Sequence, residues 1–261
     1  MNGGERNELR LALMLVFMRD CRSGDMVDGL GKIQSVGFQG REYGKWSKSG
    51  LSANGSLPNM GDKQLAAVVA VLGISKAGIS SKADITVNGI PISLKSFQHA
   101  PPALVNHTSR PGWETACMHI GADILLLDQL IDRYWALRTC GRIKEDICND
   151  STESPFARHK TYLMPILDYF LRTGSGQGPS TSPAELILDF KTAEDVASWK
   201  VYRSRELLSE VWPRLVFSVR SKKGMPSGYP NMQDIEKFES IKKWTRYWQE
   251  QYRGALHVRV R

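Results

Sequence analysis

The chain has 261 residues, enough for one large domain or two small ones with a sizeable hydrophobic core. Hydrophobic residues make up 41% and charged residues 24%, as in globular proteins, and no uninterrupted apolar run approaches the roughly 18 residues that span a bilayer. The 35 Lys and Arg residues exceed the 27 Asp and Glu residues, and the resulting net charge of +8 favours an anionic partner such as nucleic acid.

The cysteines indicate a reducing compartment. Cys21, Cys117, Cys140 and Cys148 have neither CxxC spacing nor paired histidines beside them, so free thiols are expected instead of disulfides or a zinc site. The apolar stretch RLALMLVFM is short and follows acidic residues, unlike a secretory signal. We therefore expect a soluble, cytoplasmic protein with no membrane partner.

The first part of the chain alternates predicted helices with strands. Residues 5–20 are apolar nearly all round at helical spacing, which predicts a buried helix. Residues 22–60 contain eight glycines and are expected to be rich in loops. Residues 62–74 predict a second helix that ends at Gly73. Alternating residues on both sides of Asn88-Gly89 then predict a β-hairpin over 82–97.

The second part of the chain continues the mixed pattern. A proline-rich loop over 98–112 is followed by a long helix from Trp113 to Arg138, and a further helix is expected over 159–174. Residues 175–183 are a flexible stretch and the place of a soft boundary within a single domain, 1–261. Strands are predicted over 184–190, 214–221 and 255–261, and a basic, aromatic helix over 238–254. The expected fold class is mixed α/β (α+β) around a sheet.

The predicted hairpin brings an acid and a lysine together. If Asn88-Gly89 closes it, Asp84 lies close to residues 93–95 on the antiparallel strand. Ser93 and Lys95 share one face of that strand, and Leu94 points away from it. Aspartate is depleted in strands, so its presence in the hairpin needs an explanation.

Phosphodiester hydrolysis would explain this pairing. A metal ion neutralises the phosphate and acidifies a water, and a lysine orients that water and stabilises the transition state. A hard metal takes carboxylate and carbonyl oxygens, such as those of Asp84 and of the Leu94 backbone. The alternative is an exposed Asp–Lys pair across two strands, which contributes a few tenths of a kcal/mol, roughly.

The stretch ADITVNGIPISLKSF resembles the core hairpin of the PD-(D/E)xK nuclease superfamily, which includes most type II restriction endonucleases. Asp84 matches the first acid of the family motif and Lys95 matches its lysine. Ala83 stands where the family often has Pro, and Ser93 stands where it usually has Glu or Asp. The resemblance implies a restriction-endonuclease-like fold, with a central mixed β-sheet flanked by helices, and Mg²⁺ as the cofactor. Some members with S-x-K in the hairpin recruit the second carboxylate from the next helix.

Two glutamates are candidates for that second carboxylate. Glu114 opens the next predicted helix, on the apolar stripe of Cys117, Ile120 and Ile124 that is expected to face the sheet. Burial there would be costly without a cation, although a first-turn glutamate is also favoured by the helix dipole. Glu8 is the competitor, because members of the superfamily often have a glutamate on the first helix that points into the active site.

Several loops and basic stretches are candidates for DNA contact. Residues 98–112 directly follow the hairpin, and residues 40–50, 219–230 and 242–254 combine basic and aromatic residues with glycine. Each of them could instead be a solvated surface. Lys and Arg neutralise phosphates and also read guanine. The candidate DNA-contacting residues are Arg41, Lys45, Lys48, Gln98, His99, Asn106, His107, Arg110, Arg220, Lys222 and Lys223.

These features lead to the hypothesis of a Mg²⁺-dependent type II restriction endonuclease acting on double-stranded DNA. Asp84 and either Glu114 or Glu8 would bind the metal, Lys95 would position the attacking water, and Ser93 would fill the place of the usual acid. Cutting both strands of a symmetric site would favour a homodimer or homotetramer, with no small-molecule cofactor. The alternatives are a repair or phage nuclease of the same fold, and a non-catalytic DNA-binding protein whose nuclease fold has lost an acid.

Overall fold

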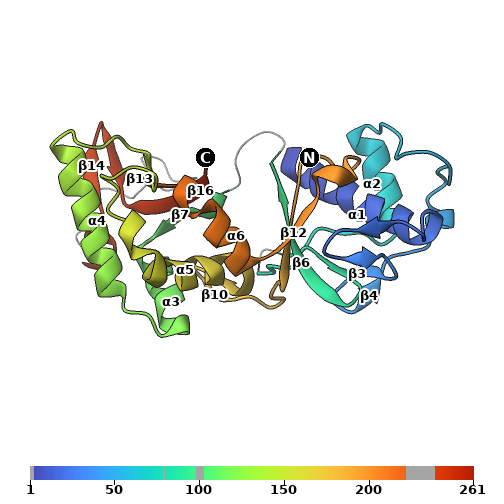
Figure 1. The fold of residues 1–261 in the computed structure, drawn as a ribbon, viewed down its shortest axis with the longest axis horizontal. Coiled ribbons are helices and arrows are strands. Elements are labelled where there is room, and N and C mark those ends of the chain that lie inside the picture. The colour runs from blue at the N-terminus through green and yellow to red at the C-terminus, as the bar shows by residue number, and fades with distance from the viewer. Residues whose placement is uncertain (1–2, 79, 98–102, 222–238) are drawn as a thin grey trace. The chain divides into compact units, whose positions relative to one another are not determined.

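The computed structural model describes residues 3–78, 80–97, 103–221 and 239–261. The chain divides into two compact units (Figure 1), of which the first is Met1–Ala100 with Ser180–Ser204 and the second is Pro101–Pro179 with Arg205–Arg261. One passage between the units, at Pro179 to Ser180, falls inside the glycine- and serine-rich stretch over 175–183. No helix in the described ranges is long and apolar enough to cross a membrane.

A six-stranded mixed sheet forms the centre of the first unit. Its strand order is β12 (Lys200–Arg203), β11 (Leu186–Phe190), β6 (Ile90–Ser96), β5 (Ile85–Val87), β3 (Val36–Phe38) and β4 (Arg41–Glu42). Neighbouring strands are antiparallel except β6 and β11, which run parallel with Leu94 beside Leu188. The predicted mixed α/β class, with a mixed sheet flanked by helices, is confirmed.

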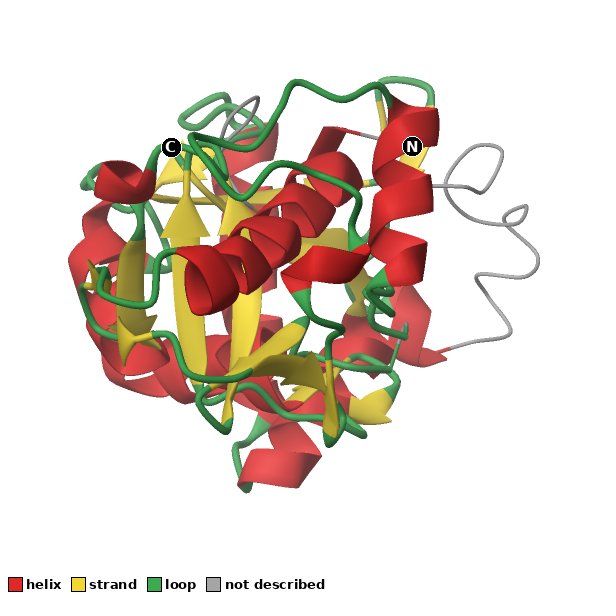
Figure 2. Cartoon of the chain, turned by 90° about the vertical axis from the view of Figure 1, so that its right-hand side faces the viewer, coloured by secondary structure: helices red, strands yellow, loops and turns green. Residues whose placement is uncertain are grey.

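Helices α1 (Gly3–Cys21) and α2 (Asp62–Val71) pack in the first unit and confirm the two predicted helices. Figure 2 looks onto this unit, where helices lie in front of the sheet strands. Residues 11–18 of α1 are all buried, together with apolar side chains of β5, β6 and β11. The remaining short elements of the unit are β1 (Met26–Val27), β2 (Gly31–Lys32) and the 3₁₀ turns η1 (Trp46–Lys48) and η4 (Val196–Ser198).

The turn between β5 and β6 is the one that the sequence predicts. Asn88 and Gly89 both have positive φ, 53° and 82°, as a two-residue turn between antiparallel strands requires. The Asn88 side chain also accepts hydrogen bonds from the backbone N–H groups of Gln34 (2.8 Å) and Ser35 (3.2 Å). The turn is therefore held from outside the hairpin as well as by its own residues, and the register of β6 follows from it.

The second unit contains a four-stranded antiparallel sheet. The strand order is β7 (Ala103–Ser109), β16 (Ala255–Val260), β13 (Leu215–Arg220) and β8 (Ile147–Cys148). Its helices are α3 (Arg110–Ile120), α4 (Ile124–Thr139), α5 (Lys160–Asp168), the π-helical turn η3 (Tyr169–Thr173), α6 (Ser204–Val211) and α8 (Glu239–Lys242). Its short elements are η2 (Ala157–His159), η5 (Trp212–Arg214), β9 (Gly174–Ser175), β10 (Gly178–Pro179), β14 (Arg246–Trp248) and β15 (Gln251–Arg253).

Three sequence predictions for this unit are wrong. The loop expected over 98–112 contains strand β7, so its second half is regular structure. The long helix expected from Trp113 to Arg138 is two helices, because Gly121 adopts a left-handed conformation (φ 69°) that ends α3. The helix expected over 238–254 is a single helical turn followed by the β14–β15 hairpin, in which Tyr247 and Tyr252 lie opposite each other with ring centroids 4.9 Å apart. The strands predicted over 184–190, 214–221 and 255–261 are confirmed as β11, β13 and β16.

Candidate active site

Asp84 is held across the β5–β6 hairpin. It directly precedes β5, and its backbone N–H donates to the Ile92 carbonyl oxygen (2.9 Å). Its Oδ2 atom accepts hydrogen bonds from the Leu94 backbone N–H (2.7 Å) and from the Ser93 hydroxyl (3.3 Å). The predicted closeness of Asp84 to residues 93–95 is confirmed. Ser93 is buried, and its hydroxyl acts as a donor that orients the Asp84 carboxylate.

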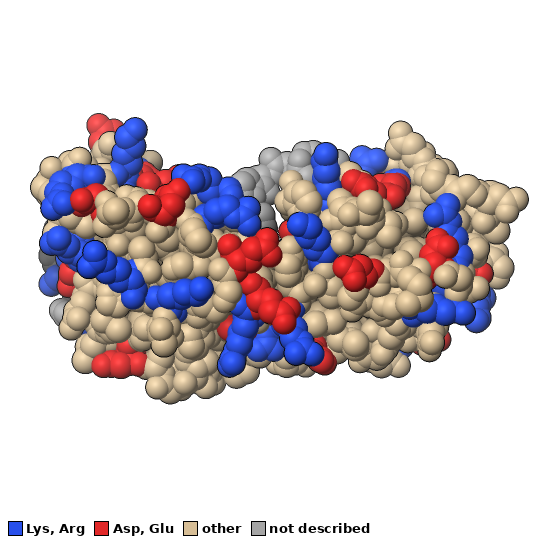
Figure 3. Space-filling model, in the orientation of Figure 1, with Lys and Arg blue, Asp and Glu red and all other residues tan. Residues whose placement is uncertain are grey.

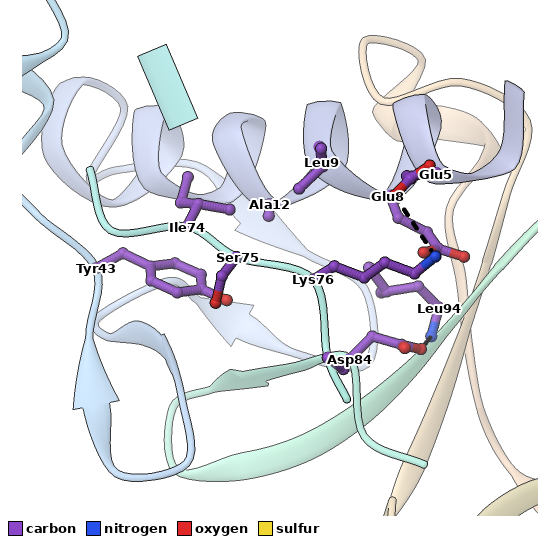
Figure 4. Close-up of a pocket in the computed structure, with 11 residues that line it drawn as sticks. Glu5, Glu8, Leu9, Ala12, Tyr43, Ile74, Ser75, Lys76, Asp84 and Leu94 are labelled. Atoms are coloured by element: carbon purple, nitrogen blue, oxygen red, sulfur yellow. Dashed lines mark hydrogen bonds and ion pairs between the residues drawn. The ribbon is translucent and has the colours of Figure 1, made fainter. Parts of the chain in front are cut away.

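Helix α1 brings Glu8 to the same place. A small cavity of about 20 Å³, enough for one water-sized occupant, separates α1 from the hairpin. Figure 4 shows Glu8 reaching from the helix toward the side of the cavity where Asp84 lies. The lining residues are Glu5, Glu8, Leu9, Ala12, Tyr43, Ile74, Ser75, Lys76, Ala77, Asp84 and Leu94.

The N-terminal end of α1 is anchored near the end of β6. The buried Asn7 side chain donates a hydrogen bond from Nδ2 to the Ser96 hydroxyl oxygen (2.9 Å). The Arg6 guanidinium donates to the Met60 carbonyl oxygen (2.7 Å). These two hydrogen bonds tie the first turns of α1 to the end of β6 and to the loop at Met60. Glu8 lies within one helical turn of both Arg6 and Asn7. Glu8 is therefore positioned by the packing of the helix.

The pKa of Glu8 is raised from its ordinary value to about 7, mainly by burial and also by the negative charge of Asp84. The positive charges of Lys95 and Lys76 act against this rise. No hydrogen bond from the described residues contributes to the pKa of the Glu8 carboxyl. Three carboxyl groups line this cavity, those of Glu5, Glu8 and Asp84, and Lys76 Nζ lies 3.5 Å from Glu5 Oε1. The negative charges at the cavity wall therefore outnumber the positive one, which favours a bound cation.

The two lysines near Asp84 complete the charge cluster. The pKa of Lys82 is lowered to about 8, mainly by burial and also by the nearby ammonium of Lys95, while Asp84 opposes the change. Lys95 is half-buried on β6. The residues that line the cavity include Leu94 but neither of its neighbours Ser93 and Lys95. Lys95 acts on the site through its charge, which lowers the pKa of Glu8.

Glu114 lies in the second unit, on α3. Its Oε1 atom forms an ion pair with Arg110 Nη1 at 3.0 Å, and its side chain is 47% exposed. The prediction that Glu114 is buried is wrong, because the buried face of α3 consists of Arg110, Gly112, Trp113, Ala116 and Cys117. Glu114 follows Trp113 by one position and so points about 100° away from it. Its role as a metal ligand stays a prediction.

Several of the predicted DNA-contacting residues make contacts within the protein itself. Arg110 is buried, and its guanidinium donates two hydrogen bonds to Asp128, at 2.7 and 2.9 Å, so its predicted place in a surface loop is wrong. Arg220 is half-buried and donates to Asp146 at 2.7 Å. His107 lies on β7, and its ring centroid is 4.8 Å from that of His257.

The other predicted contacts are exposed or lie outside the described residues. Arg41, Lys45, Lys48 and Asn106 have exposed side chains, and their contact with DNA stays a prediction. Figure 3 shows Lys and Arg interspersed with Asp and Glu on one face of each unit, so the excess charge is not gathered there in a patch of one sign. Four further candidates lie outside the described residues: Gln98, His99, Lys222 and Lys223.

Sequence reasoning missed four side chains of this site. Glu5, Tyr43, Lys76 and Lys82 lie around the cavity or its charge cluster. Burial raises the pKa of Tyr43 to about 12, and Asp84 adds to that rise. Two of them had a sequence signal: Lys82 lies two residues before Asp84, and Glu5 lies three residues before Glu8 on the same helix. Tyr43 and Lys76 reach the site from separate segments, and their spacing along the chain carries no such information.

The donor atoms at the cavity suit a hard cation. Asp84 and Glu8 supply carboxylate oxygens, and Mg²⁺ is often held by one or two carboxylates with water and phosphate as its other ligands. No group of three or more His, Cys, Asp or Glu side chains within the described ranges is placed to hold a metal. The two carboxylates therefore fit Mg²⁺ only in a site that leaves most of the coordination to water and substrate.

Comparisons with known proteins add no further information about this site. No protein-family model, curated protein or solved structure matches the chain. The resemblance to PD-(D/E)xK nucleases therefore stays a prediction from the residues of the hairpin.

Proposed function

We propose that this protein is a Mg²⁺-dependent endonuclease that hydrolyses phosphodiester bonds of double-stranded DNA, as a type II restriction enzyme does. The observation that carries the proposal is the meeting of Asp84 and Glu8 at one cavity, with the charge of Lys95 close enough to lower the pKa of Glu8. Two acids and a lysine drawn from a hairpin and a helix can together support metal-assisted phosphodiester hydrolysis.

Asp84 and Glu8 would hold the metal ion, and Glu8 takes the place that Ser93 leaves without an acid. When bound, Mg²⁺ supplies neutralisation of the phosphate and a more acidic water. Lys95 would orient that water and stabilise the negative charge that develops on phosphate oxygens. Ser93 would keep Asp84 in position through its hydroxyl, which is 3.3 Å from Oδ2. Metal ligands must be deprotonated, so binding should strengthen as the pH rises.

Binding of DNA would depend on exposed basic residues. The net charge of +8 favours a polyanion, and Arg41, Lys45 and Lys48 are exposed in the unit that carries Asp84. The proposal includes a homodimer or homotetramer, because cutting both strands of a symmetric site needs two active sites.

The test is cleavage of mixed-sequence plasmid DNA with and without Mg²⁺. We expect discrete fragments with the parent protein, and loss of cutting by at least a hundredfold with Asp84→Asn, Lys95→Ala and Glu8→Gln. Glu114→Gln is the matched control, and it should cut like the parent. A smear in place of fragments would indicate a nonspecific nuclease. If Lys95→Ala cuts as well as the parent, the assignment of the site is wrong.

A non-catalytic DNA-binding protein is the second candidate. Two observations favour this candidate. The Oδ2 atom of Asp84 already accepts two hydrogen bonds from the protein, and a buried serine, Ser93, occupies the position of the usual second acid. Intact plasmid with retarded mobility at every Mg²⁺ concentration would support this candidate and would contradict the nuclease.

A further inference from the structure

The second unit has a cavity of about 250 Å³ that the proposed nuclease site does not use. Its walls are Lys160, Thr161, Met164 and Pro165 of α5 and Arg205 of α6. The hydroxyl of Ser209 on α6 lies 4.0 Å from the sulfur of Met164, which places the two helices against each other. The cavity therefore lies where α5 and α6 pack.

The charges around this cavity are all positive. Two of its five lining residues are cationic, and none is acidic. Within the described residues, neither Lys160 nor Arg205 has a carboxylate partner. Arg214, just beyond the end of α6, differs in this respect, because it pairs with Glu210. No carboxylate of the described part of the chain therefore competes with an anion for Lys160 and Arg205.

The other lining residues fit the same kind of ligand. Thr161 adds a hydroxyl, which donates well to phosphate oxygens. Met164 and Pro165 contribute apolar walls, and a less polar surrounding strengthens the attraction between an anion and the two cations. The volume lies below the roughly 300–1,000 Å³ of pockets that enclose a whole small molecule. It suits one group of a larger partner better than an enclosed ligand.

We propose that this cavity binds a phosphate group, held by Lys160 and Arg205 with Thr161 as an additional donor. The expected source of the phosphate is the DNA backbone, and in this respect the inference rests on the proposed function. An interaction of this kind positions a duplex and carries no sequence information. Inorganic phosphate or the phosphate of a free nucleotide is the other source of the same chemistry.

The test measures binding without cleavage. Fluorescence anisotropy of a labelled duplex is followed in EDTA over a range of salt concentrations, with the full chain and with Lys160→Met/Arg205→Met. We expect Kd to rise at least tenfold at low salt, by the same factor for unrelated sequences. The slope of log Kd against log salt should fall by about 1 for each phosphate that the variant no longer neutralises. The control Arg214→Met removes a paired arginine close to the same helix and should change Kd less than twofold.

A second arm separates the sources of the phosphate. Inorganic phosphate is titrated into the parent and the double variant, and binding is followed by the shift of the thermal unfolding midpoint. If phosphate binding is lost in the double variant while duplex binding is unchanged, the cavity serves free anions. If neither measurement differs from the parent, the proposal is overturned. Lys160→Arg/Arg205→Lys, which keeps both charges, should bind like the parent and shows that any loss is not misfolding.

Neither arm depends on catalysis. A chain that never cleaves DNA but loses duplex affinity in Lys160→Met/Arg205→Met would support the phosphate site and contradict the nuclease. If the parent cleaves DNA and the double variant binds the duplex as tightly as the parent, the result would support the nuclease and contradict the phosphate site.

Discussion

Two acids, one in each unit, differ in what surrounds them. Asp128 in the second unit is 3% exposed and accepts hydrogen bonds from Arg110, from Trp244 Nε1 (2.7 Å) and from Lys243 (2.8 Å). Burial alone would raise its pKa, but these donors together hold the pKa below its ordinary value. Glu8 in the first unit is half-buried. Burial and the negative charge of Asp84 raise its pKa to about 7, although the positive charges of Lys95 and Lys76 oppose this rise.

This contrast separates a structural acid from a candidate functional one. A buried carboxylate with matched donors stabilises the fold around it. The ionised form of a half-buried carboxyl beside a second acid is destabilised, and carboxyl groups with such raised pKa values are frequent at functional sites. Asp128 in the second unit is an acid whose hydrogen-bond donors lower its pKa, whereas the pKa of Glu8 is raised.

The largest expected effect follows from removing the satisfied acid. Asp128→Ala leaves the buried guanidinium of Arg110 without its partner and should lower the free energy of unfolding by about 3–5 kcal/mol. Urea denaturation measures the change. Asp132→Ala, which removes an exposed partner of Arg246, is the control and should change stability by less than about 0.5 kcal/mol. Equal losses in the two variants would contradict the comparison.

The buried His257 should make the second unit sensitive to acid. Burial lowers its pKa to about 4, and the charges of Arg220, His107 and Arg259 act in the same direction, opposed by Asp146. The unfolded chain takes up the proton near pH 6.5, before the folded chain does, so stability falls as the pH decreases from about 6.5 to about 4. The loss should be about 2 kcal/mol and should be absent in His257→Gln, as urea denaturation at several pH values can test.

Glu8 should respond to pH with the opposite sign. Its pKa in the folded chain lies above that of the unfolded chain, so its contribution is fully present below about pH 4.5 and is lost as the pH rises through about 7. In metal-free buffer at pH 8, Glu8→Gln should therefore be more stable than the parent by about 1 kcal/mol, discounted because the carboxyl reaches the cavity. A variant that is less stable than the parent at pH 8 would show that Glu8 is satisfied in the folded state.

The smallest effect is expected at an exposed ion pair. Arg142 Nη2 lies 2.6 Å from Glu153 Oε2, and both side chains are well exposed. Solvent screening should limit the effect of Arg142→Ala to about 0.5 kcal/mol in thermal or urea unfolding. A loss near that of Asp128→Ala would mean that distance alone, without burial, decides the value of an ion pair in this protein.

Local sequence patterns correctly predicted those elements in which all neighbouring residues favour the same secondary structure. The apolar run of α1, the periodicity of α2 and the Asn88-Gly89 turn each specify their structure over a few neighbouring residues. Prediction failed where a single residue interrupts a pattern, as Gly121 does between α3 and α4. It also failed at the aromatic pair Tyr247 and Tyr252, because a helix and a hairpin both tolerate such residues and only pairing across strands distinguishes them.

The candidate site divides in the same way. The sequence by itself determined that Asp84 meets residues 93–95, since a two-residue turn fixes the register of the hairpin that it closes. It left Glu114 and Glu8 as competing candidates for the second acid. Only the tertiary structure placed Glu8 at the cavity beside Asp84, and the exposed Glu114 in an ion pair with the buried Arg110. The reason is physical: the position of α1 depends on packing and on hydrogen bonds between residues as far apart as Asn7 and Ser96, which no local pattern contains.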